Sequence, residues 1–156
     1  MKTLSVKQPW ALLLVAGIKD IENRTWKTSY RGRIFIHASG KAANFWDSPQ
    51  WKLVHDEINK ISINKYEKTT GLFSSILGSV EIVDCVLNHE SVWAEHFTMK
   101  EKKVAGEKFI VEVPVYNWVI ANPIMFANPQ PNIKGKLGLW DFDNTKGILD
   151  LTQVKL

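Results

Sequence analysis

Cysteine is almost absent from this sequence, because Cys85 is the single thiol among 156 residues. No internal disulfide can form, which favours a reducing compartment, and we therefore expect a cytoplasmic protein. Cys85 lies in the apolar stretch GSVEIVDCVL without an adjacent basic side chain, a setting typical of a structural thiol rather than a reactive one.

The common signatures of cofactor and metal sites are also missing. The chain has no glycine-rich phosphate loop, no nucleophile elbow and no dinucleotide fingerprint. His89-Glu90 and Glu95-His96 are neighbouring pairs, but their spacing matches no common zinc signature. We therefore expect no metal and no cofactor.

Long apolar runs and linkers are lacking as well. The stretch WALLLVA is far shorter than the run of about 20 apolar residues that spans a bilayer, so we expect no membrane association. No serine- or glycine-rich linker, internal repeat or long run of one charge divides the chain. With 45% hydrophobic residues, the sequence predicts a single domain over residues 1–156.

Positive charge and tryptophan are what the chain has instead. The formal net charge is +4, the pI is about 9.1, and seven tryptophans occur in 156 residues. A basic balance fits a polyanionic partner, and large aromatic side chains form either the core or a stacking surface for bases. This combination is compatible with nucleic-acid binding without establishing it.

Periodicity predicts the elements of the first half. Leu4 and Val6 alternate with polar residues as in a short strand, and the all-apolar residues 10–16 predict a buried helix that ends at Gly17. A second strand is predicted over residues 33–38. Ser48 and Pro49 predict the start of an amphipathic helix whose apolar stripe is Trp51, Val54, Ile58 and Ile61.

Strands predominate in the second half. Residues 76–87, 108–120 and 136–142 predict strands, residues 91–106 predict short helical turns and loop, and residues 122–135 predict an irregular connection. The mixed order favours an α+β fold in which a small mixed β-barrel carries flanking helices.

The stretch GIKDIENRTW follows the first predicted helix and is unusually charged. In an extended segment Glu22 and Arg24 share one face, and Lys19 lies near them after the turn at Gly17. Unpaired buried charges cost several kcal/mol, so these groups are solvated, paired with one another, or arranged around a ligand.

Lys19 and Glu22 are the candidate catalytic residues. To act as a general base, Lys19 would need a pKa lowered at a cost of about 4 kcal/mol, and an ion pair with Glu22 would oppose that change. A charged Lys19 is therefore the better interpretation, as a clamp for a phosphate or a carbonyl oxygen. His37 could be an acid/base group or a hydrogen-bonded structural residue.

Aromatic and basic side chains alternate through and beyond this stretch. Such a mixture is typical of grooves that stack single-stranded bases and neutralise phosphates. The predicted nucleic-acid-binding residues are Lys19, Glu22, Arg24, Trp26, Tyr30, Arg31, Arg33, Trp10, Trp118, Lys134 and Lys136.

Several blocks of the sequence together resemble the ASCH domain of the PUA-like superfamily. They are SVKQPWALLLVAGIKDIENRTW, YRGRIFIHAS, GSVEIVDC and NPQPNIKGKLGLWDF, and the Gly-x-Lys-x-x-Glu-x-Arg signature falls on Gly17, Lys19, Glu22 and Arg24. The resemblance implies a PUA-like β-barrel and a cleft where the signature residues face RNA or a modified nucleotide.

The resemblance leaves the activity open. Some small ASCH proteins look like amidohydrolases of N4-acetylcytidine that use Lys-x-x-Thr, but Glu22 occupies the threonine position here, which argues against that activity. Metal-independent ribonuclease or modified-nucleoside hydrolase activity at the same cleft is the alternative to an RNA- or nucleotide-binding module. A protein partner is a third hypothesis.

Overall fold

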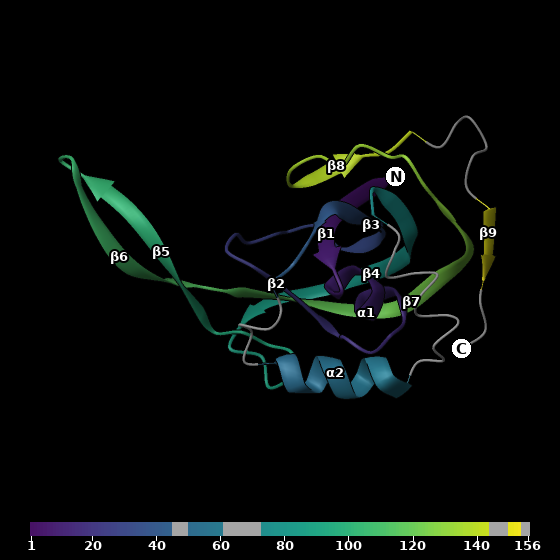
Figure 1. The fold of residues 1–156 in the computed structure, drawn as a ribbon, viewed down its shortest axis with the longest axis horizontal. Coiled ribbons are helices and arrows are strands. Elements are labelled where there is room, and N and C mark those ends of the chain that lie inside the picture. The colour runs from purple at the N-terminus through teal and green to yellow at the C-terminus, as the bar shows by residue number, and fades with distance from the viewer. Residues whose placement is uncertain (45–49, 61–72, 144–149, 154–156) are drawn as a thin grey trace.

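In a computed structural model of the chain, the described residues are 1–44, 50–60, 73–143 and 150–153. They form a mostly β fold with two helices (Figure 1). In chain order the elements are β1 (Lys2–Gln8), α1 (Trp10–Val15), β2 (Ile21–Arg24), β3 (Gly32–Ala42), α2 (Trp51–Lys60), β4 (Ser75–Leu87), β5 (Phe97–Val104), β6 (Glu107–Pro114), β7 (Tyr116–Gln130), β8 (Leu139–Asp141) and β9 (Asp150–Gln153).

The larger sheet has the order β2-β7-β4-β3-β1-β8, and β9 pairs with β7. β1 and β3 are parallel, and the other pairs in this sheet are antiparallel. The α+β prediction is confirmed. The predicted barrel is not, because within the described residues the sheet ends at β2 and at β8, which do not pair with each other.

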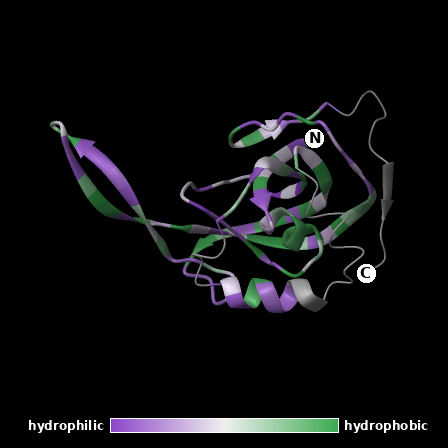
Figure 2. Cartoon of the chain, viewed as in Figure 1, coloured by the Kyte–Doolittle hydropathy of each residue, from purple (hydrophilic) through white to green (hydrophobic). Residues whose placement is uncertain are grey.

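Helix α1 packs against β1, β3, β4 and β7 and is buried on all sides, as its uniform hydrophobicity predicts (Figure 2). Leu12 and Leu14 join the main core cluster, whereas Leu13 belongs to a second cluster on the α2 side. The helix ends as predicted at Gly17, whose φ of +74° is a left-handed conformation that glycine adopts without strain.

Strand β3 is buried on both faces at its centre. Ile34 and Ile36 face the main core with α1, and Phe35 packs against Phe126 in a third cluster. The strand is longer than the predicted residues 33–38, because β4 and β1 pair with it on either side.

Helix α2 confirms the second predicted helix, with one correction. Val54 is fully buried against Leu13, Ile21 and Trp93, but Trp51 is 43% exposed and does not extend the buried stripe. The described part of the chain does not include residues 48 and 49, Ile61 or the side chain of Ile58.

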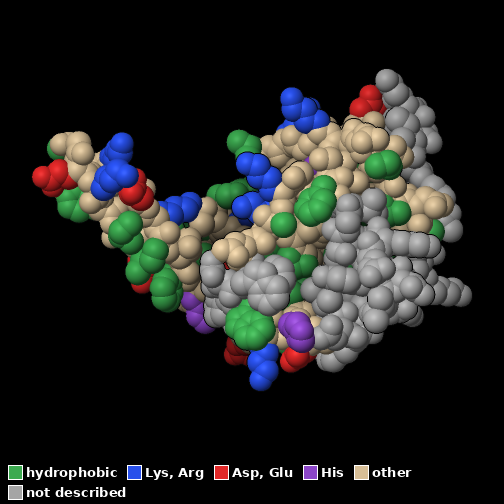
Figure 3. Space-filling view, viewed as in Figure 1, with side chains coloured by type: hydrophobic (Ala, Val, Ile, Leu, Met, Phe, Trp, Pro, Cys, Tyr) green, Lys and Arg blue, Asp and Glu red, His purple; other side chains and the backbone are tan. Residues whose placement is uncertain are grey.

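The predictions for residues 91–106 and 122–135 are largely wrong. Strands β5 and β6 form a separate two-stranded arm that extends away from the body (Figure 1), and β7 continues to Gln130. Residues 108–120, predicted as one strand, are divided between β6 and β7. Hydrophobic side chains lie along one edge of the arm (Figure 3). Phe97, Met99 and Ile110 are exposed residues of its two strands.

Neither described helix is long and apolar enough to cross a membrane, since α1 has 6 residues and α2 has 10.

Candidate nucleic-acid interface

The turn after α1 delivers the signature residues to the open edge of the sheet. The backbone amides of Ile18 and Lys19 both donate to the carbonyl of Leu13 at 3.0 Å, which closes the end of the helix. The chain then enters β2, where Glu22 lies opposite Trp118 of β7. A helix end and a strand register therefore fix the positions of Lys19 and Glu22.

Three charged groups converge there. Glu22 Oε2 lies 3.6 Å from Lys19 Nζ, and Glu22 Oε1 lies 2.9 Å from Arg24 Nη2. Lys19 is 3% exposed and Glu22 is 6% exposed. Lys19 Nζ also donates to the carbonyl of Ile21 and lies 5.7 Å from the ring centre of Trp10. The carboxylate thus bridges two cations whose burial without it would be costly.

Arg24 crosses the gap that keeps the sheet open. Its Nη2 donates to the carbonyl of Ser5 in β1 at 2.9 Å, so a side chain joins β2 to β1 where no backbone pairing exists. Arg24 Nε is buried and has no hydrogen-bond partner among the described atoms. The guanidinium group of Arg24 therefore keeps one buried donor without a partner among the described atoms.

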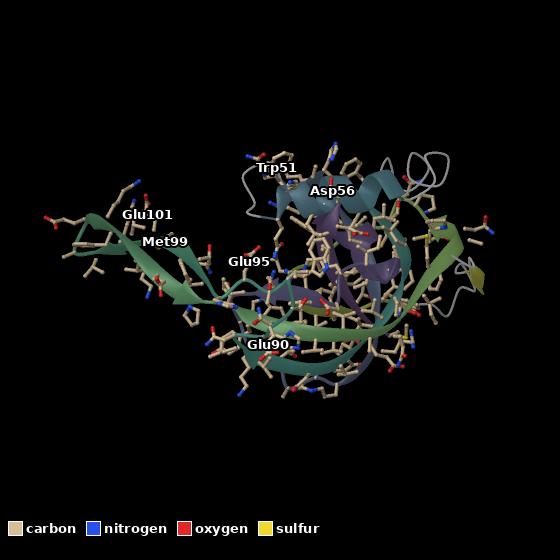
Figure 4. All side chains as sticks on the ribbon, turned by 90° about the horizontal axis from the view of Figure 1, so that it is seen from below. Trp51, Asp56, Glu90, Glu95, Met99 and Glu101 are labelled. Carbon is tan, nitrogen blue, oxygen red and sulfur yellow. The ribbon has the colours of Figure 1, made fainter. Side chains whose placement is uncertain are left out.

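Burial and charge act in opposite directions on Lys19. Burial lowers the pKa of Lys19, and the carboxylates of Glu22 and then Glu95 oppose this effect. Burial raises the pKa of Glu95, against the influence of Lys19. Glu95 lies in the loop between the body and the arm (Figure 4), and it is a second carboxyl neighbour of Lys19 that no sequence pattern indicated.

Two asparagines hold this loop in place. Asn23 Nδ2 donates to the carbonyl of Trp93 at 2.9 Å, and Asn23 Oδ1 accepts from the amide of Glu95 at 3.1 Å. Asn117 Nδ2 donates to Asn23 Oδ1 at 3.0 Å and to the carbonyl of Glu95 at 2.8 Å. Because amide side chains satisfy these backbone groups, Glu95 is fixed relative to β2.

A cleft of about 470 Å³ opens along the gap between β1 and β2. Trp10 contributes an aromatic wall and meets Trp93 edge to face, with 6.4 Å between ring centres. Glu22 and Arg24 line the cleft, and so does the exposed Lys7. The full lining is Ser5, Val6, Lys7, Trp10, Glu22, Asn23, Arg24, Ser39, Ala43, Lys136, Leu137 and Gly138.

A second hollow of about 310 Å³ adjoins the first and shares Ser5, Ser39, Lys136 and Leu137 with it. Its other lining residues are His37, Gly40 and Gly135. The two hollows together form one groove beside the end of β1.

His37 is held at both ring nitrogens under the second hollow. Nε2 lies 2.9 Å from the carbonyl of Ile133, which can only accept, and Nδ1 lies 3.2 Å from Ser5 Oγ. Burial lowers the pKa of His37, so a neutral ring donates through Nε2 and accepts the Ser5 hydroxyl at Nδ1. Trp140 Nε1 donates to Ser5 Oγ at 3.2 Å. The arrangement supports a structural role for His37.

A comparison with known protein families decides where this chain belongs. The family described as the ASCH domain matches residues 4–130, which include α1, β2 and most of β1 and of the larger sheet. The chain belongs to the ASCH domain family.

Two relatives carry the name Activating signal cointegrator 1. The human protein is 39% identical over 150 residues and the mouse protein is 31% identical over 143 residues, in each case covering 90% of this chain. The chain spans only 22% of the length of either relative.

In this ASCH domain the structure brings Trp10, Glu22, Arg24 and Lys136 together at the groove. Lys19 lies below them, because its ammonium group is directed at Glu22 and the Ile21 carbonyl and is not part of the lining. Lys19 is therefore not positioned to bind a phosphate in the groove directly.

Other predicted residues lie elsewhere. Trp118 is fully buried and donates through Nε1 to the carbonyl of Trp26 at 3.2 Å, and the two rings meet edge to face at 4.5 Å. Tyr30 donates to the carbonyl of Arg33 at 3.0 Å. Trp118 thus has no exposed face on which a base could stack.

The remaining cations also stay outside the groove lining. Arg31 pairs with Asp84 and Arg33 pairs with Glu81, each at 2.8 Å. Lys134 is exposed near the groove but does not line it.

Sequence reasoning missed Ser5, Asn23, Glu95, Asn117 and Leu137. Asn23 lies within the signature stretch, yet alternation placed it on the face opposite Glu22 and gave no reason to assign it a role. Ser5, Glu95 and Asn117 come from separate elements that meet only through tertiary contacts. Leu137 is 99% exposed, and nothing in the sequence distinguishes it from a core leucine.

Within the described ranges, no group of three or more His, Cys, Asp and Glu side chains is arranged to hold a metal ion.

Proposed function

We propose that this ASCH domain binds single-stranded RNA or a modified nucleotide in the groove between β1 and β2. The observation that carries this proposal is the composition of the groove. A tryptophan wall, a carboxylate and a guanidinium group lie together, and Lys7 and Lys136 add exposed positive charge.

Each group has a defined chemical use for such a ligand. Trp10 offers an aromatic surface to a base, and stacking of this kind contributes about 1–3 kcal/mol per base. Glu22 accepts hydrogen bonds from an amino or imino group, and Arg24 presents the positive charge of its guanidinium group to the groove. Lys7 and Lys136 neutralise phosphates, and Lys19 holds the Glu22 carboxylate from below.

Salt dependence tests this proposal. Affinity for a single-stranded ribo-octanucleotide should fall as salt rises, because bound phosphates release counterions when they meet lysine. Lys7→Gln and Lys136→Gln should each weaken binding and reduce the slope of log affinity against log salt by about 1. Fluorescence anisotropy across a salt series measures both effects.

Lys52→Gln on α2 is the matched control, because Lys52 is an exposed lysine that lines neither hollow. The proposal fails if the octanucleotide does not bind at low salt, or if the two groove variants behave like the control.

An enzyme at the same groove is the second candidate, and the opposed pKa directions of Lys19 and Glu95 favour it. Burial lowers the pKa of Lys19 and raises the pKa of Glu95, and both groups lie behind Glu22, which lines the groove and would pass a proton between them and a bound nucleotide. Ribonuclease or modified-nucleoside hydrolase chemistry would fit such a pair. Removal of an acetyl group from N4-acetylcytidine remains disfavoured, since Glu22 occupies the position of the threonine.

Turnover by purified protein tests the enzyme hypothesis. Cleavage of a labelled RNA or release of an acyl group should survive repeated purification and fall by at least about 100-fold in Glu95→Gln, if Glu95 transfers the proton. Glu90→Gln, an exposed carboxylate in the same loop, is the control. Activity that is equal in the two variants would exclude Glu95 from the chemistry.

A protein partner and a cytoplasmic location remain predictions. The exposed arm, with Phe97, Met99 and Ile110 on its surface, is the region where a protein contact would be sought first.

A further inference from the structure

We infer that the groove accepts two consecutive nucleotides of one strand, with the second hollow as a distinct nucleotide subsite. The inference rests on the proposed function and adds to it the minimum ligand, a dinucleotide step instead of a single nucleotide.

The size and connection of the hollows support two subsites. Their volumes are about 470 Å³ and about 310 Å³, and Ser5, Ser39, Lys136 and Leu137 line both. Small-molecule pockets occupy about 300–1,000 Å³, so each hollow has room for one nucleoside. A ligand confined to the first hollow would leave the second one empty.

Lys136 lies where the link between two nucleosides would fall. It lines both hollows, and its ammonium group lies 5.7 Å from the ring centre of Trp140. It forms no ion pair with any carboxylate in the described ranges, so its charge is available to a ligand. A phosphodiester places one negative charge between neighbouring nucleosides, which matches a single lysine shared by two subsites.

Two of the residues that line the second hollow, Gly40 and Gly135, have no side chain, and Gly135 packs closely over His37 and Ser5. A Cβ at Gly135 would lie 2.6 Å from His37 Cε1 and 2.8 Å from Ser5 Oγ. His37 cannot easily move aside, since both ring nitrogens are hydrogen-bonded. An added methyl group would therefore displace the loop that carries Lys136 and reshape this hollow.

The hydroxyl groups supply polar contacts for a sugar or a base edge. Ser5 Oγ accepts from Trp140 Nε1 and is held against His37 Nδ1. Ser39 Oγ donates to the carbonyl of Lys41 at 2.9 Å, which leaves its lone pairs free to accept a further hydrogen bond. Both hydroxyl groups line the two hollows, whereas the carboxylate of Glu22 and the guanidinium group of Arg24 line only the first.

The test compares ligands of one and two nucleotides. The probes are the four ribonucleoside 3′-monophosphates and the sixteen ribodinucleoside monophosphates, titrated by NMR chemical-shift perturbation. The best dinucleoside monophosphate should bind at least about tenfold more tightly than the best mononucleotide, because a second base adds its own stacking and hydrogen bonds. Equal affinities would overturn the inference.

Gly135→Ala should reduce the ratio of dinucleotide affinity to mononucleotide affinity, because it alters the second hollow directly and the first hollow only through the shared loop. Lys136→Gln should reduce dinucleotide affinity, whereas the control Lys102→Gln on the arm should not. Thermal unfolding checks that Gly135→Ala is folded. If Gly135→Ala does not fold, Gly40→Ala is used in its place. Gly40 also lines only the second hollow, and a Cβ there makes a milder contact, 3.3 Å from Ser74 Oγ.

The two levels of the proposal can fail separately. If the octanucleotide binds but dinucleotides gain nothing over mononucleotides, or Gly135→Ala keeps the full gain, the second subsite is wrong and the binding function stands. If no octanucleotide binds at low salt, the binding function itself fails, and the second subsite with it.

Discussion

Glu22→Gln should lower the free energy of unfolding by about 3–5 kcal/mol, because it leaves the ammonium group of Lys19 buried without its carboxylate partner. The side chains of Lys19 and Glu22 are 3% and 8% exposed, so water cannot replace the lost interaction. Glutamine keeps the shape of the side chain and removes only its charge. Urea denaturation followed by circular dichroism measures the change.

The loss should depend on pH in a specific direction. Without Glu22, burial depresses the pKa of Lys19 in the folded protein further below its value in the unfolded chain. The unfolded chain then binds more protons between these two pKa values, so the stability of the variant rises with pH in that window. The difference from the wild-type protein should be smaller at about pH 9.5 than at about pH 6.

Two further variants isolate the cause. Lys19→Met combined with Glu22→Gln should recover part of the stability, because no charged lysine then remains buried. Glu81→Gln breaks the pair with Arg33, whose side chains are 32% and 30% exposed, and should cost about 1 kcal/mol or less. A loss in Glu22→Gln that is as small as in Glu81→Gln and independent of pH would contradict the buried ion-pair assignment.

Trp118→Ala should cost about 3–5 kcal/mol, the range for removal of a fully buried tryptophan. Trp118 heads the fully buried side chains by volume and connects β7 to β2 and β4, opposite Glu22 and Cys85. The cavity would lie directly beneath β2, so the position of the signature residues should be disturbed together with the stability. The shift of the urea midpoint measures the stability change.

Trp118→Phe separates packing from hydrogen bonding. Phenylalanine retains a ring against Trp26 but leaves the carbonyl of Trp26 without its donor, which should cost about 1–3 kcal/mol plus the lost volume. Val92→Ala is the control, since Val92 is 70% exposed and should change stability by less than about 0.5 kcal/mol. An unchanged midpoint in Trp118→Ala would refute the core assignment.

The arm shows why part of the fold could not be predicted. Residues 97–104 carry three lysines and a glutamate among few apolar residues, a composition that does not indicate a buried strand. They form β5 because β6 pairs with them in register from Phe97 opposite Pro114 to Val104 opposite Glu107. Backbone hydrogen bonds to β6 therefore hold β5, and burial of its side chains does not. Hydrophobic periodicity reports only side-chain burial, so it does not predict a strand of this kind.

The end of β7 illustrates a second limit. Proline and asparagine at residues 122, 123, 128 and 129 are typical of a connection, yet β7 runs through them to Gln130. The register with β4 shifts at three places, and Asn122 has a φ of +47°. Such irregularities accommodate residues that regular strands exclude, and their positions depend on the partner strand.

Local sequence patterns were sufficient to predict the buried first helix, its end at Gly17, the strand that follows and the charged stretch as the candidate site. These are local properties, because hydrophobic periodicity and the conformational freedom of glycine act within a few residues. The sequence also carried the family resemblance that the match over residues 4–130 confirms.

The surroundings of the charged stretch depend on tertiary packing. It buried Lys19 beneath Glu22, moved Trp118 into the core, and brought Ser5, Glu95 and Lys136 to the site from distant parts of the chain. It also left the sheet open between β1 and β2, where Arg24 spans the gap and the groove forms. Exposure and proximity depend on how separate elements pack, and a pattern within one element cannot specify them.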